Sequence, residues 1–171
     1  MVFSRCVIVL FCCFCLSIGC SGDSYRECDL TLLHGSFYGI KWGESFSNIS
    51  RKVILVRTRF GGTDKEPGYQ IIDGLPLEIK GIPVDIFFQF IDNQLNVIHI
   101  YANKDNKQAL ISAFYVQYGK PIALPTKNTA VWQDSTSTLT LQRELMDGGC
   151  LFSFVDNANY MSLTGRVMRK Y

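Results

Sequence analysis

The chain has 171 residues, with 17 Lys and Arg against 15 Asp and Glu, and its formal net charge is +2. This length suits one domain, and near neutrality without a basic stripe argues against a nucleic-acid-binding protein. Beyond residue 20 the sequence has no His-x-x-x-His or Cys-x-x-Cys spacing, no Gly-x-Ser-x-Gly elbow and no Walker loop, which excludes the commonest metal, hydrolase and nucleotide sites.

Residues 1–20 have the composition of a secretory signal peptide. Residues 1–5 carry one positive charge, and residues 6–16 form an unbroken apolar run. The stretch Ser17-Ile18-Gly19 then offers small residues, Ser17 and Gly19, at the two positions that a signal peptidase reads. The run is too short to span a membrane, and it lacks the polar face that a buried core helix would need. The pattern therefore predicts export.

Cys20 follows this segment directly and leaves two kinds of processing open. The stretch from Leu16 to Cys20 is similar to a bacterial lipoprotein signal, in which the cysteine is lipidated, although Leu16 stands one position too early. The alternative is simple cleavage between residues 19 and 22. Lipidation of Cys20 would tether the domain to a membrane surface without a spanning helix.

Two cysteines, Cys28 and Cys150, remain beyond the signal segment. In an exported chain such a pair favours a single disulfide, which would join the start of the domain to a strand near its end. Closing so long a loop stabilises the fold by about 4 kcal/mol at most. The alternative is two unpaired buried thiols.

The hydrophobic pattern divides the rest of the chain into a polar tether at residues 21–27, one α+β domain at residues 28–156 and a C-terminal tail at residues 157–171. In the first half of the domain, Ser45 is a candidate N-cap for a helix whose apolar residues recur at helical spacing. Alternating and apolar runs after it predict strands, and glycine-rich polar segments predict turns. The elements expected there are a strand at 28–33, a helix at 46–53, a strand at 54–60, a loop at 61–68, and strands at 69–72 and 75–79.

Residues 82–102 read as a β-hairpin, because two apolar runs flank a short polar turn. In the first run one face is apolar, while Asp85, Phe87 and Gln89 share the other, which is expected to lie nearer water. The second run alternates less regularly, so its register stays open. The apolar face of the first run consists of Val84, Ile86, Phe88 and Phe90.

The second half of the domain contains the strongest helix signal of the chain, at residues 107–118, where Gly119 and Pro121 form the stop. We expect this helix to pack on the apolar face of the sheet. Three strands follow, at residues 129–133, 138–144 and 150–155. The order predicts an α+β fold, in which two helices pack on one face of an antiparallel sheet, possibly as two helix-then-strands units.

Two local patterns carry a resemblance to a known group. One is Trp42-Gly43-x-Ser45 at a helix start, and the other is residues 118–121 (Tyr-Gly-Lys-Pro) at a helix end, followed by Trp132 and Leu139-x-Leu141. Over residues 38–156 the chain resembles small exported bacterial domains of the β-lactamase-inhibitor-protein and outer-membrane-assembly-lipoprotein (BamE-type) group, in which a helix precedes a run of antiparallel strands. The resemblance implies a fold and a compartment, and no functional residue of the inhibitor proteins carries over to this sequence.

These features favour an exported, non-catalytic protein-interaction module of the bacterial envelope, such as an assembly factor, inhibitor or immunity protein. Its expected partner is another envelope protein, with no cofactor, no nucleic acid and no membrane contact except through a lipid anchor. Aromatic anchors dominate interface hot spots, and the candidate interaction face is Trp42, Phe87 and Tyr101.

Two other functions stay open. One is a small-ligand binder that uses a cleft between the sheet and the loop at residues 61–68. The other is an enzyme with an unrecognised site, which would need His34 or His99 beside a carboxylate. Because His99 lies in an apolar strand, we interpret it as a structural histidine.

Overall fold

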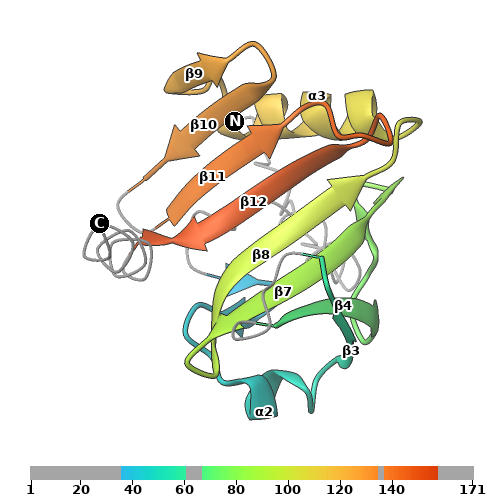
Figure 1. The fold of residues 1–171 in the computed structure, drawn as a ribbon, viewed down its shortest axis with the longest axis vertical. Coiled ribbons are helices and arrows are strands. Elements are labelled where there is room, and N and C mark those ends of the chain that lie inside the picture. Colours follow the sequence, from blue (N-terminus) through green and yellow to red (C-terminus); the bar gives the residue numbers. More distant parts are fainter. Residues whose placement is uncertain (1–35, 61–66, 135–136, 158–171) are drawn as a thin grey trace, which may run out of the picture.

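The computed structural model of the chain describes residues 36–60, 67–134 and 137–157. Eight antiparallel strands form one twisted sheet, in the order β3-β4-β7-β8-β12-β11-β10-β9 (Figure 1). Two short pairs flank it, β1 (Ser36–Phe37) with β2 (Ile40–Lys41) and β5 (Glu78–Ile79) with β6 (Ile82–Pro83). The sheet strands are β3 (Ile54–Thr58), β4 (Gly68–Asp73), β7 (Asp85–Ile91), β8 (Gln94–Ala102), β9 (Ala123–Thr126), β10 (Thr129–Gln133), β11 (Ser137–Gln142) and β12 (Cys150–Asp156).

The prediction of an α+β fold with two helices packed on one face of the sheet is wrong. Strands make up 51% of the described residues and helices 15%, so the fold is mainly β. One helix, α3 (Lys107–Tyr118), lies across the sheet, whereas α2 (Phe46–Ile49) is a single turn at one end of it (Figure 1). The predicted helix at 46–53 stops early because its serines and Asn48 are poor helix formers, although Ser45 does cap it.

The main core lies between the sheet and α3. The ring of Phe114 on α3 stacks on that of Phe152 on β12, with 3.8 Å between the centroids, and Phe154 lies next to it at 5.8 Å. All three side chains are fully buried. The face of the β7–β8 hairpin that was predicted to be apolar, with Ile86 and Phe88, belongs to the same core. The alternating pattern of the first strand of this hairpin therefore predicts correctly which of its faces lies in the core.

A register shift in the β7–β8 pair explains the irregular alternation of the second strand. Gln89 pairs with Val97, but Phe90 pairs with Leu95, so Asn96 is the extra residue on β8. Asn96 is buried, and its Nδ2 donates to the carbonyl oxygens of Ile91 at 3.2 Å and Gln94 at 2.7 Å. These bonds satisfy the amide donor in an interior where an unpaired polar group would be costly.

The sheet is built from two successive units that meet in its middle. The first unit runs α2, β3, β4, β7 and β8, and the second runs α3, β9, β10, β11 and β12. Their last strands pair antiparallel, with Ile100 of β8 opposite Phe152 of β12. As a result β3 and β9, the first sheet strand of each unit, form the two edges of the sheet (Figure 1).

We expect Gly74→Ala to destabilise the fold more than Gly81→Ala does. Both glycines have a positive φ, +93° and +77°, so both substitutions carry the strain of the left-handed region, about 1–2 kcal/mol. A Cβ at Gly74 would also lie 2.6 Å from the Lys52 carbonyl oxygen, whereas one at Gly81 meets nothing within 4 Å. Urea unfolding of both variants measures the difference, and equal losses would contradict a backbone clash at Gly74.

Candidate functional site

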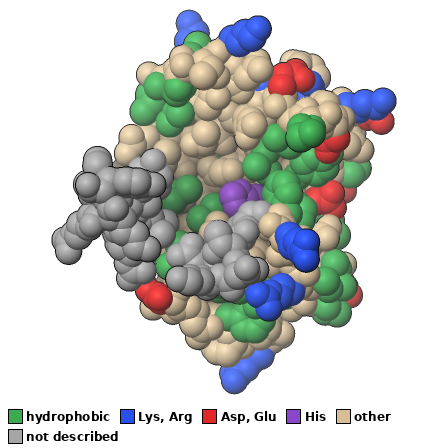
Figure 2. Space-filling view, in the orientation of Figure 1, with side chains coloured by type: hydrophobic (Ala, Val, Ile, Leu, Met, Phe, Trp, Pro, Cys, Tyr) green, Lys and Arg blue, Asp and Glu red, His purple; other side chains and the backbone are tan. Residues whose placement is uncertain are grey.

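The sheet has a second face, which points away from α3. Its side chains alternate with the core residues along the central strands, and the register places Phe87 opposite His99 and His99 opposite Ser153. Figure 2 shows the molecule from this side, because α3 lies behind the sheet in the same orientation. We call this surface the second face. Its central residues are Asp85, Phe87, Gln89, Val97, His99, Tyr101 and Ser153.

His99 lies at the middle of the second face in an aromatic setting. Its Nδ1 is 2.9 Å from the Ser153 hydroxyl, and the ring of Phe60 contacts both Phe87, at 4.5 Å between centroids, and His99, at 6.1 Å. Burial lowers the pKa of His99 to about 4, so the imidazole is neutral near pH 7. Its Nε2 is buried and has no hydrogen-bond partner among the described residues. No described carboxylate bonds to the ring, which favours a structural role for His99.

Exposed apolar side chains gather at the β3 end of the sheet. Ile54 and Val56 alternate with Leu55 along β3 and are 54% and 47% exposed. Ile72, at the register shift between β3 and β4, is 49% exposed, and Phe60 beyond the end of β3 is 36% exposed. We call Ile54, Val56, Phe60 and Ile72 the β3–β4 patch. Grouped exposure of large apolar residues is unusual on a protein surface and marks contact sites.

Basic side chains border the β3–β4 patch. Residues 51–60 contain Arg51, Lys52, Arg57 and Arg59, all exposed, and no acidic residue. Lys52 forms an ion pair with Glu44 at 2.6 Å, whereas the three arginines form no ion pair within the described parts of the chain. Figure 2 shows basic side chains over the part of the molecule that holds β3 and α2. The patch therefore has an apolar centre and a positively charged border.

The structure brings two of the three predicted interaction residues to one face. Phe87 and Tyr101 both lie on the second face, but Phe87 is buried, and Tyr101 donates from its hydroxyl to Asp147 at 2.7 Å. That hydrogen bond, together with burial, raises the pKa of Tyr101 to about 12. Trp42 instead packs against the main core.

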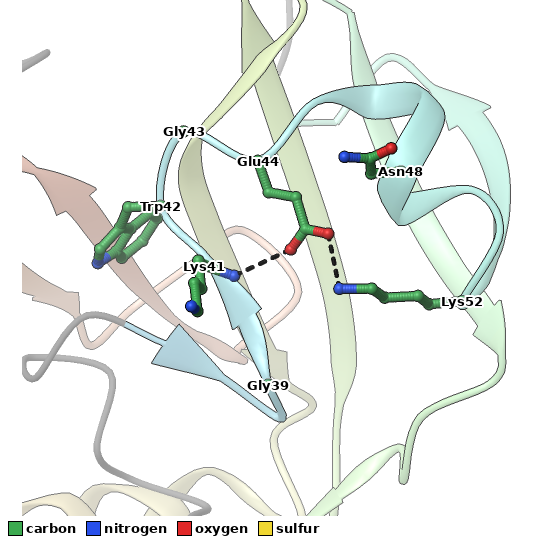
Figure 3. A pocket seen from close by; sticks show the side chains of 7 residues that line it. All are labelled: Gly39, Lys41, Trp42, Gly43, Glu44, Asn48 and Lys52. Atoms are coloured by element: carbon green, nitrogen blue, oxygen red, sulfur yellow. Dashed lines mark hydrogen bonds and ion pairs between the residues drawn. The ribbon is translucent and has the colours of Figure 1, made fainter.

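A pocket of about 400 Å³ lies beside α2 (Figure 3). Burial raises the pKa of Glu44, but hydrogen bonds from the Lys52 ammonium and from the Lys41 backbone outweigh it, so the pKa is lowered overall. Trp42 points away from Glu44, Asn48 and Lys52 in Figure 3, and its indole N–H is buried with no hydrogen-bond partner among the described residues. The Glu44 carboxylate is thus already bonded to Lys52 and to the Lys41 backbone, so these polar groups satisfy one another and do not favour a small-molecule site.

Several predicted features lie wholly or partly outside the described residues. Cys20, Cys28 and His34 lie there, as do residues 61–66 of the predicted ligand cleft. Cys150 is buried and has no disulfide partner among the described residues, and burial raises the pKa of its thiol to about 11. The disulfide and the cleft therefore stay predictions. Within the described ranges, no three His, Cys, Asp or Glu side chains are grouped to hold a metal ion.

A family model, the TP0088 domain, matches residues 74–165, which is more than half of the 171-residue chain. The chain belongs to the TP0088 domain family. The match of the TP0088 domain covers β5 to β12 and α3, and it begins directly after β4. No curated protein and no solved structure matches the chain. The resemblance of this TP0088 domain to the inhibitor-protein and BamE-type group therefore stays a prediction.

None of the helices in the described part of this TP0088 domain has the length and apolar character needed to cross a membrane.

Proposed function

We propose that this chain is a non-catalytic protein-interaction module of the bacterial envelope and that it binds another envelope protein through the β3–β4 patch. The observation that supports this proposal is the grouping of Ile54, Val56, Phe60 and Ile72 at one end of the sheet, all at least 36% exposed. An apolar patch with a polar border is the usual anatomy of a contact surface between proteins.

The chemistry of the patch suits a protein surface better than a small molecule. It is spread over an edge strand, its neighbour and the residue beyond the strand end, and such an extended apolar area is typical of protein contact surfaces. Phe60 is held in place by the ring of Phe87 at 4.5 Å, which reduces the side-chain entropy lost on binding. Each Ile or Val of the patch is about half exposed, so burying the rest of it contributes about 1 kcal/mol before the costs of association.

The envelope location in this proposal rests on residues 1–20, whose sequence favours export. The module is then either released after cleavage or held at a membrane by a lipid on Cys20. Metabolic labelling with a fatty-acid analogue, in the native protein and in Cys20→Ser, distinguishes the two forms. Label that depends on Cys20 indicates the anchored form.

The proposal is tested by capture of envelope proteins with the domain and with two charge-matched double variants. Val56→Asp with Ile72→Asp alters the patch, and Ile122→Asp with Leu124→Asp alters residues that are 66% and 63% exposed near the opposite edge. We expect the wild type and the Ile122–Leu124 variant to recover the same partner, and the Val56–Ile72 variant to recover about tenfold less, since desolvated anchors carry most binding energy.

Circular dichroism and thermal unfolding establish that both double variants are folded. The proposal fails if no specific partner is recovered by the wild type, or if a folded Val56–Ile72 variant recovers it unchanged.

A further inference from the structure

The two edges of the sheet differ in their capacity to accept another strand. β9 contains Pro125, which cannot donate a backbone hydrogen bond, and its register with β10 is irregular. β3 contains no proline and pairs regularly with β4 from Leu55 to Thr58. Because no described strand pairs with its outer side, alternate N–H and C=O groups of β3 point away from the sheet. β3 is therefore the edge with free pairing capacity.

The charges around β3 favour an acidic partner over a second copy of the chain. Arg57 and Arg59 lie on or just beyond the strand, and Arg51 and Lys52 precede it. Two antiparallel copies of β3 would bring these cations together, and like charges across strands are destabilising. An acidic segment would meet them with opposite charge, so electrostatic complementarity selects it.

The alternation along β3 also indicates the residue pattern of an acidic segment that would pair with this strand. Val56 shares its side of the strand with Ile54, whereas Arg57 is on the other side, where the register pairs it with Tyr69 of β4. An added strand would place every second residue beside the apolar pair and the residues between them beside Arg57. The matching segment alternates apolar and acidic residues.

We propose that β3 binds an extended segment of alternating apolar and acidic residues from a partner protein by adding it as a ninth strand of the sheet. This inference rests on the proposed function, and it specifies how the patch recognises its partner. Main-chain hydrogen bonds to β3 supply affinity, and the patch with Arg57 supplies selectivity.

The probe is a synthetic peptide of alternating valine and aspartate, about eight residues long so that it exceeds β3. Its binding to the full chain is measured by isothermal titration calorimetry beside a valine–lysine peptide. Two further forms are N-methylated at every valine or at every aspartate. In an added strand only alternate N–H groups face β3, so we expect one methylated form to bind like the parent and the other to lose binding.

The role of the arginines in selecting an acidic segment is tested with the double variant Arg57→Glu, Arg59→Glu. The control is the double variant Lys120→Glu, Lys127→Glu, which removes two exposed cations elsewhere on the chain. We expect the arginine variant to bind the aspartate peptide at least about tenfold more weakly and to gain binding of the lysine peptide. The Lys120–Lys127 variant should bind each of the two peptides with the same affinity as the wild type.

Strand addition is overturned if the aspartate peptide does not bind, if the two methylated forms behave alike, or if aspartate and lysine peptides bind equally. A dimer in sedimentation that depends on Val56, without peptide binding, would identify a second copy as the occupant and also overturn it. If these peptide tests fail while the Val56–Ile72 variant still fails to capture the partner, only the proposal of strand addition is rejected. The proposal of a protein-interaction module is then unaffected.

Discussion

Replacing Phe152 by Ala is expected to lower the free energy of unfolding by about 3–5 kcal/mol. The Phe152 ring is fully buried between β12 and α3, stacked at 3.8 Å on Phe114, and its strand pairs with β8 at the centre of the sheet. The neighbouring core is shared by both units, so the cavity cannot close by movement of one of them. Urea unfolding followed by tryptophan fluorescence measures the loss.

Leu151→Ala is the matched control, because Leu151 is the adjacent residue of β12 and is only partly buried on the second face. We expect it to cost about 1 kcal/mol. A Phe152→Ala variant that is no less stable than Leu151→Ala would contradict the placement of the core between α3 and the sheet.

Acidification is expected to remove about 3 kcal/mol of stability through His99 alone as the pH falls from 7 to 4. Burial lowers the pKa of His99 to about 4 in the folded chain, below its ordinary value of 6.5. Between these two values the unfolded chain binds the proton and the folded chain does not. The contribution of His99 is therefore complete above pH 6.5, declines as the pH falls, and levels off below pH 4.

The measurement compares wild type with His99→Gln in urea unfolding at a series of pH values. Carboxylates titrate in the same window in both proteins, so the difference between the two curves isolates the imidazole. Glutamine retains a polar group within reach of the Ser153 hydroxyl, which lies 2.9 Å from the His99 Nδ1. A His99 ring signal that titrates near pH 6.5 in nuclear magnetic resonance would show that the ring is not desolvated.

The local elements were predictable where sequence period and stop signals agree. The helix at 107–118 has the predicted bounds, since Gly119 and Pro121 end it, and both strands of the hairpin lie within the predicted residues 82–102. β9 was missed because all four of its residues are exposed and Pro125 interrupts the run, which gives it no buried alternation. The predicted strand at 75–79 shrinks to Glu78 and Ile79.

The assembly of these elements was not predictable from local pattern. Which strands become edges depends on the pairing of β8 with β12, and residues some fifty positions apart in sequence leave no local signature of that contact. For the same reason the β3–β4 patch was missed: the alternation of Ile54 and Val56 predicts a strand, but it does not show that none of the described strands pairs with the outer side of β3. Phe87 was placed on the correct face, but its burial under Phe60 was not predictable. The position of Arg57 on an edge strand likewise depends on the strand order of the whole sheet.

The pairing of β8 with β12 also makes the strands of the sheet differ in how strongly a substitution disturbs the fold. An edge strand takes part in one ladder, so substitutions in β3 disturb a single neighbour, whereas those in the central strands affect two ladders and the core beneath α3. The stretch matched by the TP0088 domain begins after β4 and therefore omits β3. We therefore expect substitutions in β3 to cost the fold less stability than substitutions in β8 or β12, which lie within the matched stretch.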